Sequence, residues 1–280
     1  MRKILNFGNF IKVEHTLFSL PLILSGTFLA ARGIPDLRTL ILIILAGIGA
    51  RTAALAINRI IDRRIDATNP RTKDRELPSG KITISEAVLI TCAALFLYLI
   101  SAYLICDIVF YLSPVPLAVF VIYPLMKRFT PFCHFGVGLG LAMAPLGGWL
   151  AVTCSLSGLL IPLFLSLFTL FWVSGFDIIY ATLDEEFDKE SNIFSVISSF
   201  GKQTGLKIAA YLHIMSFVCL VVIYLLEFRS LASSVILIVT GFLLYLEHKK
   251  SENVDLAFFK INIFIGFAVF IFVLTGIYLP

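Results

Sequence analysis

Two groups of acidic residues in this sequence follow the repeat of an α-helix. In the segment NRIIDRRID, Asn58, Asp62 and Asp66 are four residues apart, so each step turns by only about 40° and all three share one helix face. The segment DIIYATLDEEFD contains a second stripe at helical spacing: Asp177, Tyr180, Ala181, Asp184 and Asp188. The side chains of each stripe can therefore converge on one ligand.

The residue types in these stripes favour a divalent cation and a phosphate-bearing ligand. Mg²⁺ is usually held by one or two carboxylates together with substrate phosphates. Both stripes begin inside or at the edge of an apolar segment, where an ionisable group is costly and usually functional. A single aspartate near a helix end is most often a solvated surface residue, but two aligned stripes indicate a site for a diphosphate.

Basic residues accompany both stripes. The loop ATNPRTKDRELPSGK and the segment YPLMKRFT carry cations that suit the same anion: Arg71, Lys73, Arg75, Lys81, Lys127 and Arg128. The alternative for each residue taken alone is the general excess of Lys and Arg in cytoplasmic loops. Arg51 differs because it lies within an apolar run two turns before Asn58, so it must face the interior of a helix bundle and find a partner there.

The segments that position these residues are typical of an integral membrane protein. Of the 280 residues, 59% are hydrophobic and 14% are charged, and the mean hydropathy is +0.97; a soluble domain carries about 25% charged residues. Runs such as LILIILAGIGA are continuously apolar and do not alternate like barrel strands. We expect an all-α protein with residues 1–280 forming a single polytopic domain. Nine segments match the roughly 20 residues of a spanning helix: 17–34, 37–58, 85–105, 107–125, 131–152, 158–180, 205–225, 230–246 and 258–279.

The distribution of Lys and Arg predicts the orientation of the chain. With the N-terminus inside, 18 of the 22 lie on the inner side, and Arg32, Arg38 and Arg229 lie on the opposite side. Positive residues in short loops stay in the cytoplasm, so we expect a cytoplasmic N-terminus in the cytoplasmic (inner) membrane. The same bias accounts for the net charge of +4 and removes the main reason to expect a nucleic-acid partner.

Cysteines and glycines are expected to serve packing. The five cysteines, at positions 92, 106, 133, 154 and 219, are scattered and form no C-x-x-C pair, so we expect neither a disulfide nor a zinc framework. The sequence GVGLG at 136–140 lacks the strand context of a dinucleotide-binding loop, and we expect it to allow close helix packing.

Four motifs, in order along nearly the whole chain, resemble those of the UbiA family of intramembrane aromatic prenyltransferases: N-x-x-x-D-x-x-x-D, R-x-L-P-S-G, Y-P-x-x-K-R-x-T and D-x-x-Y-A-x-x-D-x-x-x-D. The resemblance implies nine transmembrane helices around a central cavity open to the cytoplasmic side, with a polyprenyl diphosphate as donor. It also implies two Mg²⁺ ions bound by the paired motif aspartates, which are Asp62, Asp66, Asp184 and Asp188. Asn58, Asp177 and Tyr180 match further motif positions.

Within the family, the segments KVEHTLFSLP, FWVSGFDIIYA and LYLEH are most similar to the 4-hydroxybenzoate polyprenyltransferase-like subgroup. This likeness implies prenylation of 4-hydroxybenzoate or 1,4-dihydroxy-6-naphthoate in ubiquinone or menaquinone biosynthesis. Homogentisate, haem and a glycerol phosphate remain alternative acceptors within the family. A secondary transporter would also carry intramembrane charges, but its sites lie near the midplane, whereas these carboxylates are predicted at the cytoplasmic helix ends.

The mechanism implied by the family assigns roles to the remaining polar residues. Four cations are expected to assist the metals in stabilising the departing diphosphate: Arg71, Arg75, Lys127 and Arg128. Tyr180 and the other aromatic residues are the candidates for stabilising the carbocation, and Asp177 is the candidate for accepting the phenolic proton or orienting the acceptor. Arg51 is the candidate for the acceptor carboxylate, with an ion pair to an internal aspartate as the alternative. Glu14 and His15 could line the acceptor entrance or anchor the chain at the interface.

Overall fold

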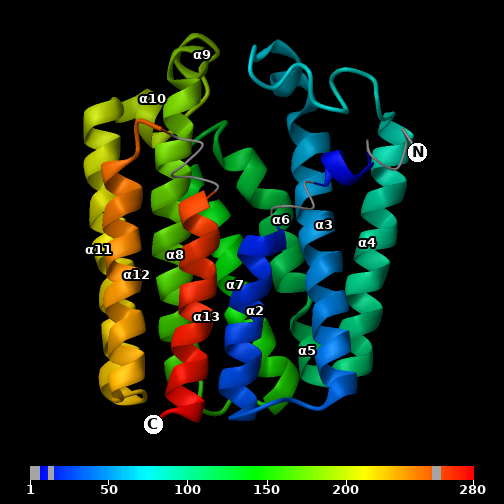
Figure 1. Ribbon diagram of the computed structural model, residues 1–280. Coiled ribbons are helices and arrows are strands. Elements are labelled where there is room, and N and C mark those ends of the chain that lie inside the picture. Colours follow the sequence, from blue (N-terminus) through cyan, green and yellow to red (C-terminus); the bar gives the residue numbers. More distant parts are fainter. Residues whose placement is uncertain (1–6, 12–15, 254–259) are drawn as a thin grey trace.

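The chain forms a bundle of helices that run between two ends of the molecule (Figure 1). The computed structural model describes residues 7–11, 16–253 and 260–280, so Glu14 and His15 lie outside the described residues. The longer helices are α2 (Thr16–Ala31), α3 (Leu37–Thr68), α4 (Ile84–Ile105), α6 (Pro114–Met126), α7 (Cys133–Thr153), α8 (Leu160–Ala181), α11 (Lys202–Leu226), α12 (Leu231–Lys249) and α13 (Asn262–Tyr278). The shorter elements are α5 (Asp107–Leu112), the 3₁₀ turn η2 (Thr182–Asp184), α9 (Glu185–Glu190) and α10 (Val196–Phe200). Across the described ranges there is no β-strand, which confirms the predicted all-α class.

Each predicted span overlaps one helix or, for 107–125, the pair α5 and α6, and α3 continues ten residues beyond the predicted end at 58. By length and composition, 7 helical stretches are able to cross a membrane, the first being Leu37–Thr68 and the last Leu231–Lys249. The helices of the remaining two predicted spans, α2 and α13, are apolar but have only 16 and 17 residues. These are fewer than the roughly 20 that a perpendicular span requires. The count of nine spans therefore stays a prediction.

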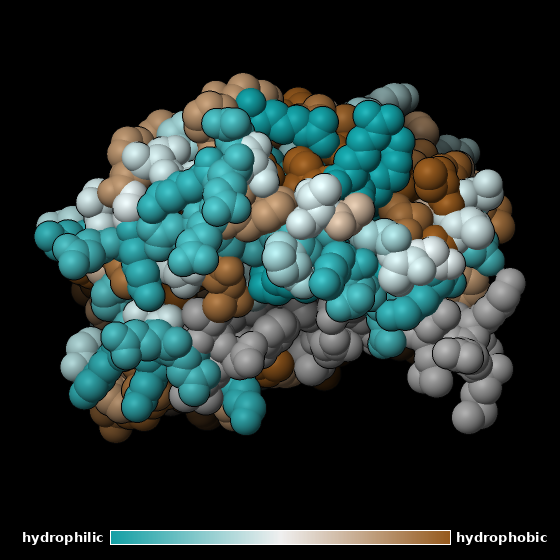
Figure 2. Space-filling model, turned by 90° about the horizontal axis from the view of Figure 1, so that it is seen from above, coloured by the Kyte–Doolittle hydropathy of each residue, from teal (hydrophilic) through white to brown (hydrophobic). Residues whose placement is uncertain are grey.

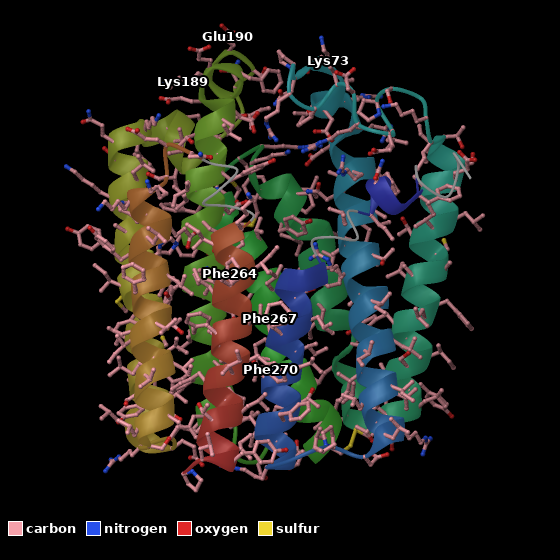
Figure 3. The ribbon with its side chains drawn as sticks, viewed as in Figure 1. Lys73, Lys189, Glu190, Phe264, Phe267 and Phe270 are labelled. Carbon is pink, nitrogen blue, oxygen red and sulfur yellow. A yellow bond between two sulfur atoms is a disulfide. The ribbon has the colours of Figure 1, made fainter. Side chains whose placement is uncertain are left out.

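The outer faces of the helices are strongly apolar, whereas one end of the bundle is polar. Phe96, Ile238 and Phe264 are 70%, 69% and 62% exposed, and Figure 3 shows Phe264, Phe267 and Phe270 along the middle of α13. Such extended apolar exposure suits contact with lipid chains. Figure 2 shows hydrophilic residues gathered over the end of the bundle that carries α9 and the loop after α3.

Glycines set the crossing of α2 and α7 in the middle of the bundle. A Cβ atom on Gly26 would lie 1.9 Å from the carbonyl oxygen of Pro145, and one on Gly148 would lie 2.2 Å from that of Ile23. Small residues let membrane helices approach until their backbones are in contact. Only glycine therefore fits at these two positions, and the crossing holds α7 between α2 and α8.

A buried polar chain joins α8 to α12 and α13 on the other side of the bundle. Trp172 Nε1 donates to Asn262 Oδ1 at 2.8 Å, and Asn262 Nδ2 donates to Glu247 Oε1 at 3.0 Å. Asn262 and Glu247 are fully buried, and polar side chains that bond between helices stabilise their association in a membrane. These contacts fix α8, the helix that leads into the second acidic stripe.

The prediction that all cysteines serve packing is wrong for two of them. Cys106, which ends α4, forms a disulfide with Cys154, which follows α7, and their Cα atoms are 6.2 Å apart. The other three, Cys92, Cys133 and Cys219, are free. The bonded pair is 48 residues apart in sequence, so only the tertiary structure, in which α5 contacts α7, reveals it. Both cysteines lie at the end of the bundle opposite to Thr68, the last residue of α3.

Candidate active site

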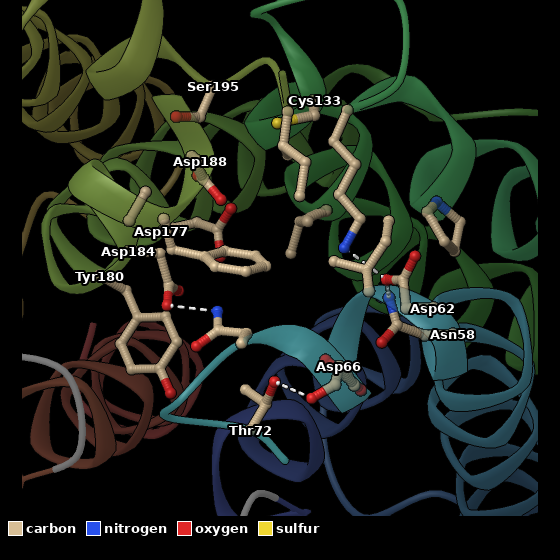
Figure 4. A pocket seen from close by; sticks show the side chains of 18 of the residues that line it. Asn58, Asp62, Asp66, Thr72, Cys133, Asp177, Tyr180, Asp184, Asp188 and Ser195 are labelled. Atoms are coloured by element: carbon tan, nitrogen blue, oxygen red, sulfur yellow. Dashed lines mark hydrogen bonds and ion pairs between the residues drawn. The ribbon is translucent and has the colours of Figure 1, made fainter. Parts of the chain in front are cut away.

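A polar cavity of about 230 Å³ opens at the hydrophilic end of the bundle, between α3, α6, α7, α8 and α9. Both acidic stripes reach it, and Figure 4 shows them on opposite sides. Most of the polar site residues predicted from the sequence line this cavity: Asn58, Asp62, Asp66, Arg71, Arg75, Lys127, Asp177, Tyr180, Asp184 and Asp188. The tertiary structure thus brings together residues from four separate motifs.

The first stripe lies on α3, which continues as one regular helix to Thr68. Asp62 and Asp66 have side chains only 3% and 7% exposed, although both line the cavity. Asn58 Nδ2 donates to Asp62 Oδ2 at 3.4 Å, one turn further along. The predicted helix face is therefore confirmed as a buried polar face directed into the cavity.

The second stripe is not a single regular helix. Helix α8 ends at Ala181, and the 3₁₀ turn Thr182–Asp184 follows before α9 begins at Glu185. A 3₁₀ turn has about three residues per turn instead of 3.6, so it changes the direction in which the following side chains project. Asp184 and Asp188 nevertheless line the same cavity as Asp177.

Arg71 closes the cavity on the side of the second stripe. Its Nε donates to Asp184 Oδ1 at 2.9 Å, its Nη2 contacts Asp184 Oδ2, and its Nη1 donates to Tyr180 Oη at 2.6 Å. The guanidinium also lies 4.8 Å from the centre of the Tyr180 ring. Burial disfavours the charged guanidinium, but the hydrogen bonds to Asp184 and Tyr180 outweigh it and raise the pKa of Arg71 above its usual value.

The first stripe is paired with cations in the same way. Arg75 Nη1 lies 2.8 Å and 3.0 Å from the two carboxylate oxygens of Asp66. Lys127 Nζ lies 2.6 Å from Asp62 Oδ2. Arg128 Nη2 is 3.8 Å from Asp62 Oδ1, but Arg128 lies at the rim and is not among the cavity-lining residues. Three of the predicted carboxylates thus have basic partners: Asp62 has Lys127 and Arg128, Asp66 has Arg75, and Asp184 has Arg71.

Sequence reasoning missed several polar residues of the site, and two of them contact motif aspartates. Asn69 Nδ2 donates to Asp184 Oδ1 at 2.9 Å, and His134 Nδ1 lies 2.7 Å from Asp177 Oδ2. The Asn-Pro pair after α3 indicates a helix end but not a contact with a distant carboxylate. His134 follows no periodic pattern, so nothing in the local sequence indicates its partner. Lys73 and Lys81, which the sequence also suggested, do not line the cavity.

Arg51 lies in a second cavity of about 300 Å³, which has an almost entirely apolar lining. Its Nε is buried without a hydrogen-bond partner, and among the residues that the structure describes no carboxylate forms an ion pair with it. Tyr123, Val137 and Asp177 line both cavities, so the two adjoin at these residues. The site therefore has a charged compartment and an apolar compartment with one buried cation.

The carboxylates are not arranged as a preformed metal cluster. Within the described ranges, no group of three or more His, Cys, Asp or Glu side chains is close enough to hold a metal ion. Instead, Lys127, Arg75 and Arg71 occupy positions beside the motif aspartates. The cavity concentrates negative charge that requires positive partners, and its donor atoms are carboxylate and amide oxygens.

A sequence model of the UbiA prenyltransferase family matches residues 19–264. The chain belongs to the UbiA prenyltransferase family. A 4-hydroxybenzoate octaprenyltransferase from Haemophilus ducreyi is 32% identical over 280 residues, which cover 96% of this chain and 98% of that protein. Another, from Vibrio parahaemolyticus, is 31% identical over 259 residues, covering 89% and 88% of the two chains.

Solved structures of UbiA family members share the fold. The apo structure of a UbiA homolog from Aeropyrum pernix K1 has a TM-score of 0.85 and 29% identity, covering 91% of this chain and 95% of that one. A UbiA homolog from Archaeoglobus fulgidus, bound to GPP and Mg²⁺, has a TM-score of 0.77 and 19% identity, covering 97% and 98%. This UbiA family member is accordingly a multi-pass membrane enzyme and a polyprenyltransferase, as the sequence motifs predicted.

Proposed function

We propose that this enzyme transfers a polyprenyl group from its diphosphate to a ring carbon of an aromatic carboxylate that also bears a phenolic hydroxyl. The candidates are 4-hydroxybenzoate and 1,4-dihydroxy-6-naphthoate, the precursors of ubiquinone and menaquinone. The observation that carries the proposal is the junction of the two cavities at Asp177: one cavity has the charge to receive a diphosphate, and the other has an apolar lining and the buried cation Arg51.

The donor diphosphate belongs in the polar cavity. Its residues fit two Mg²⁺ ions, because four aspartates from two facing stripes supply only hard oxygen donors: Asp62, Asp66, Asp184 and Asp188. When bound, the metal supplies Lewis-acid stabilisation of the leaving diphosphate. The A. fulgidus homolog bound to GPP and Mg²⁺ supports this assignment.

The basic residues of the cavity have a second role once a divalent cation takes over their carboxylates. Arg71, Arg75 and Lys127 are then available to phosphate oxygens, to which they can donate charge-assisted hydrogen bonds. Arg128 adds positive charge at the rim. Tyr180 lines the cavity beside Arg71, and its aromatic ring can stabilise the allylic cation.

The acceptor belongs at the junction and in the apolar cavity. Arg51 binds its carboxylate through the planar guanidinium fork, and the apolar lining excludes water that would capture the allylic cation. The C–O bond of the donor breaks as the ring carbon forms its new C–C bond, and Asp177 accepts the phenolic proton. The ring carbon then loses its hydrogen to the released diphosphate while Asp177 returns the proton to the oxygen, so that the products are the prenylated ring and diphosphate.

The orientation proposed from the positive residues places the polar cavity on the cytoplasmic side of the inner membrane. The disulfide supports it independently, because Cys106 and Cys154 lie at the opposite end of the bundle. Disulfides persist on the oxidising, outer side of a bacterial inner membrane and are rare in the cytosol.

The test is an assay of the full-length enzyme in membranes with one polyprenyl diphosphate and each aromatic carboxylate in parallel. We expect prenylation of at least one of the two, dependent on Mg²⁺. Homogentisate and a glycerol phosphate serve as the comparison acceptors. Transfer to either of these, with no product from both aromatic carboxylates, would overturn the proposed acceptor class.

A further inference from the structure

His134 is a buried histidine at the start of α7 with a polar partner on each ring nitrogen. Its side chain is only 3% exposed. Nδ1 lies 2.7 Å from Asp177 Oδ2, and the backbone N–H of Val196 donates to Nε2 at 3.3 Å. The imidazole therefore bridges α8, which carries Asp177, and the first residue of α10.

These partners assign the protonation state of the ring. A backbone N–H can only donate, so Nε2 must present its lone pair to Val196, and the single ring proton lies on Nδ1. Nδ1–H then donates to Asp177 Oδ2. A second proton on Nε2 would face the N–H of Val196, so the contact at Nε2 favours the neutral imidazole.

An uncharged partner distinguishes Asp177 from the ion-paired aspartates of the site. Three motif aspartates each have a Lys or Arg side chain beside them that offsets their negative charge. His134 orients Asp177 without neutralising its charge. The Asp177 side chain is 24% exposed and lines both cavities, so it can reach the acceptor while it is held by the imidazole.

The backbone around His134 is built to hold this position. A Cβ atom on Gly138, one turn further along α7, would lie 2.6 Å from the carbonyl oxygen of Leu170 in α8. This close approach is what the GVGLG segment was expected to allow. Ser174 Oγ also donates to the carbonyl oxygen of His134 at 3.3 Å. The two helices thus leave little freedom in the distance between His134 and Asp177.

His134 also connects the acceptor side with the loop that follows Asp188. In that loop, the N–H of Phe194 donates to the carbonyl oxygen of Lys127 at 2.8 Å. Cys133 Sγ donates to the carbonyl oxygen of Phe194 at 3.6 Å. The bond from Val196 to His134 continues this series, so the loop beyond the second stripe packs directly on the residue that orients Asp177.

We infer that His134 is a positioning residue: as a neutral Nδ1–H donor it holds Asp177 as the anionic proton acceptor of the reaction and couples it to the loop after Asp188. The inference rests on the proposed function, since it concerns the carboxylate that receives the phenolic proton.

The experiment compares His134→Phe, His134→Met and His134→Gln in the full-length enzyme, each in the native and the Asp177→Asn background. Phe and Met remove the donor, whereas Gln retains a donor and an acceptor in a side chain of similar length. For His134→Phe and His134→Met, kcat/KM for the aromatic acceptor is expected to fall by about 10- to 100-fold, because a hydrogen bond to a charged group is lost. The KM for the prenyl diphosphate is expected to stay within about twofold of the native value. Gln is expected to restore activity to within about threefold of the native enzyme. His248→Gln, at a histidine outside both cavities, is the control.

The Asp177→Asn background separates positioning from general structure. If His134 acts through Asp177, replacing His134 in the Asp177→Asn background should lower kcat/KM for the acceptor by less than about a further twofold. The effects of residues that act as a unit are not additive. The inference would be overturned by any of three results. The loss in acceptor kcat/KM could be equal in both backgrounds, or kcat/KM could fall for the donor as much as for the acceptor. The third result is unchanged activity of both His134→Phe and His134→Met. Failure of the native enzyme to prenylate an aromatic carboxylate would instead overturn the proposed function.

Discussion

Asn69 Nδ2 donates a hydrogen bond to Asp184 Oδ1 at 2.9 Å, although the two residues are 115 positions apart. The backbone N–H of Asn69 also bonds to the carbonyl oxygen of Ile65, and its Oδ1 accepts from the N–H of Arg71 at 2.8 Å. One amide side chain thus ends α3, shapes the basic loop and joins the two acidic stripes across the cavity.

Asn69→Ala is expected to lower kcat/KM for the prenyl diphosphate by about tenfold, because Asp184 loses a hydrogen bond to its charged form. Steady-state kinetics at saturating acceptor measure this change. Thr68→Ala is the matched control: it removes a hydrogen bond to the same carbonyl oxygen of Ile65 without touching Asp184. An equal loss in both variants would show that the effect comes from the end of α3 and not from the contact with Asp184.

Asp62→Ala and Asp184→Ala are expected to abolish turnover, because each removes one member of a carboxylate pair proposed to hold a divalent cation. Chelation by EDTA should have the same effect on the native enzyme, and added Mg²⁺ should reverse it. Glu190→Ala, at an exposed acidic residue at the end of α9, should leave activity unchanged. Near-native activity of either aspartate variant, in protein with a native melting temperature, would contradict the two-pair assignment.

Arg51→Lys is expected to raise KM for the aromatic acceptor and to leave KM for the prenyl diphosphate within about twofold. The substitution keeps the charge but loses the planar fork, and about 1.5 to 3 kcal/mol corresponds to a 10- to 150-fold loss in acceptor kcat/KM. Arg38→Lys, at an exposed arginine outside both cavities, is the control. Equal losses for both substrates would favour a structural role for Arg51.

Cysteines introduced at Lys73 and Lys189 test the orientation. Both positions lie at the hydrophilic end of the bundle (Figure 3), which we propose to be cytoplasmic. The background has the free Cys92, Cys133 and Cys219 replaced by Ser. An impermeant maleimide should label the introduced cysteines at positions 73 and 189 only after the membrane is opened. Ser157→Cys, in the exposed segment between α7 and α8, should be labelled in sealed cells. The reverse pattern would invert the topology.

The Cys106–Cys154 disulfide provides a second test of the same orientation. An impermeant phosphine added to sealed cells is expected to reduce it, because it lies on the proposed outer side. Alkylation of the released thiols followed by mass spectrometry measures the extent of reduction. A disulfide that is reduced only after the membrane is opened would place this end of the bundle in the cytoplasm.

Local periodicity was sufficient to identify the acidic residues of the polar cavity. The spacing of Asn58, Asp62 and Asp66 places them on one face of any α-helix, whatever packs around it. The apolar runs likewise predict helices, because in lipid every backbone polar group must be bonded within its own segment. Although η2 interrupts the second stripe, Asp184 and Asp188 still line the cavity.

The contacts that define the chemistry depend on helix packing. Three pairs meet only through the tertiary packing, in which α7 contacts α3, α5 and α8: His134 and Asp177, Asn69 and Asp184, and Cys106 and Cys154. No spacing within a single helix encodes these pairs. By itself, the sequence determined the helices, the two acidic stripes and, through its motifs, the family. Only the tertiary structure decided that the charged and apolar cavities adjoin at Asp177, since the close approach of α7 to α8 is a property of two helices together.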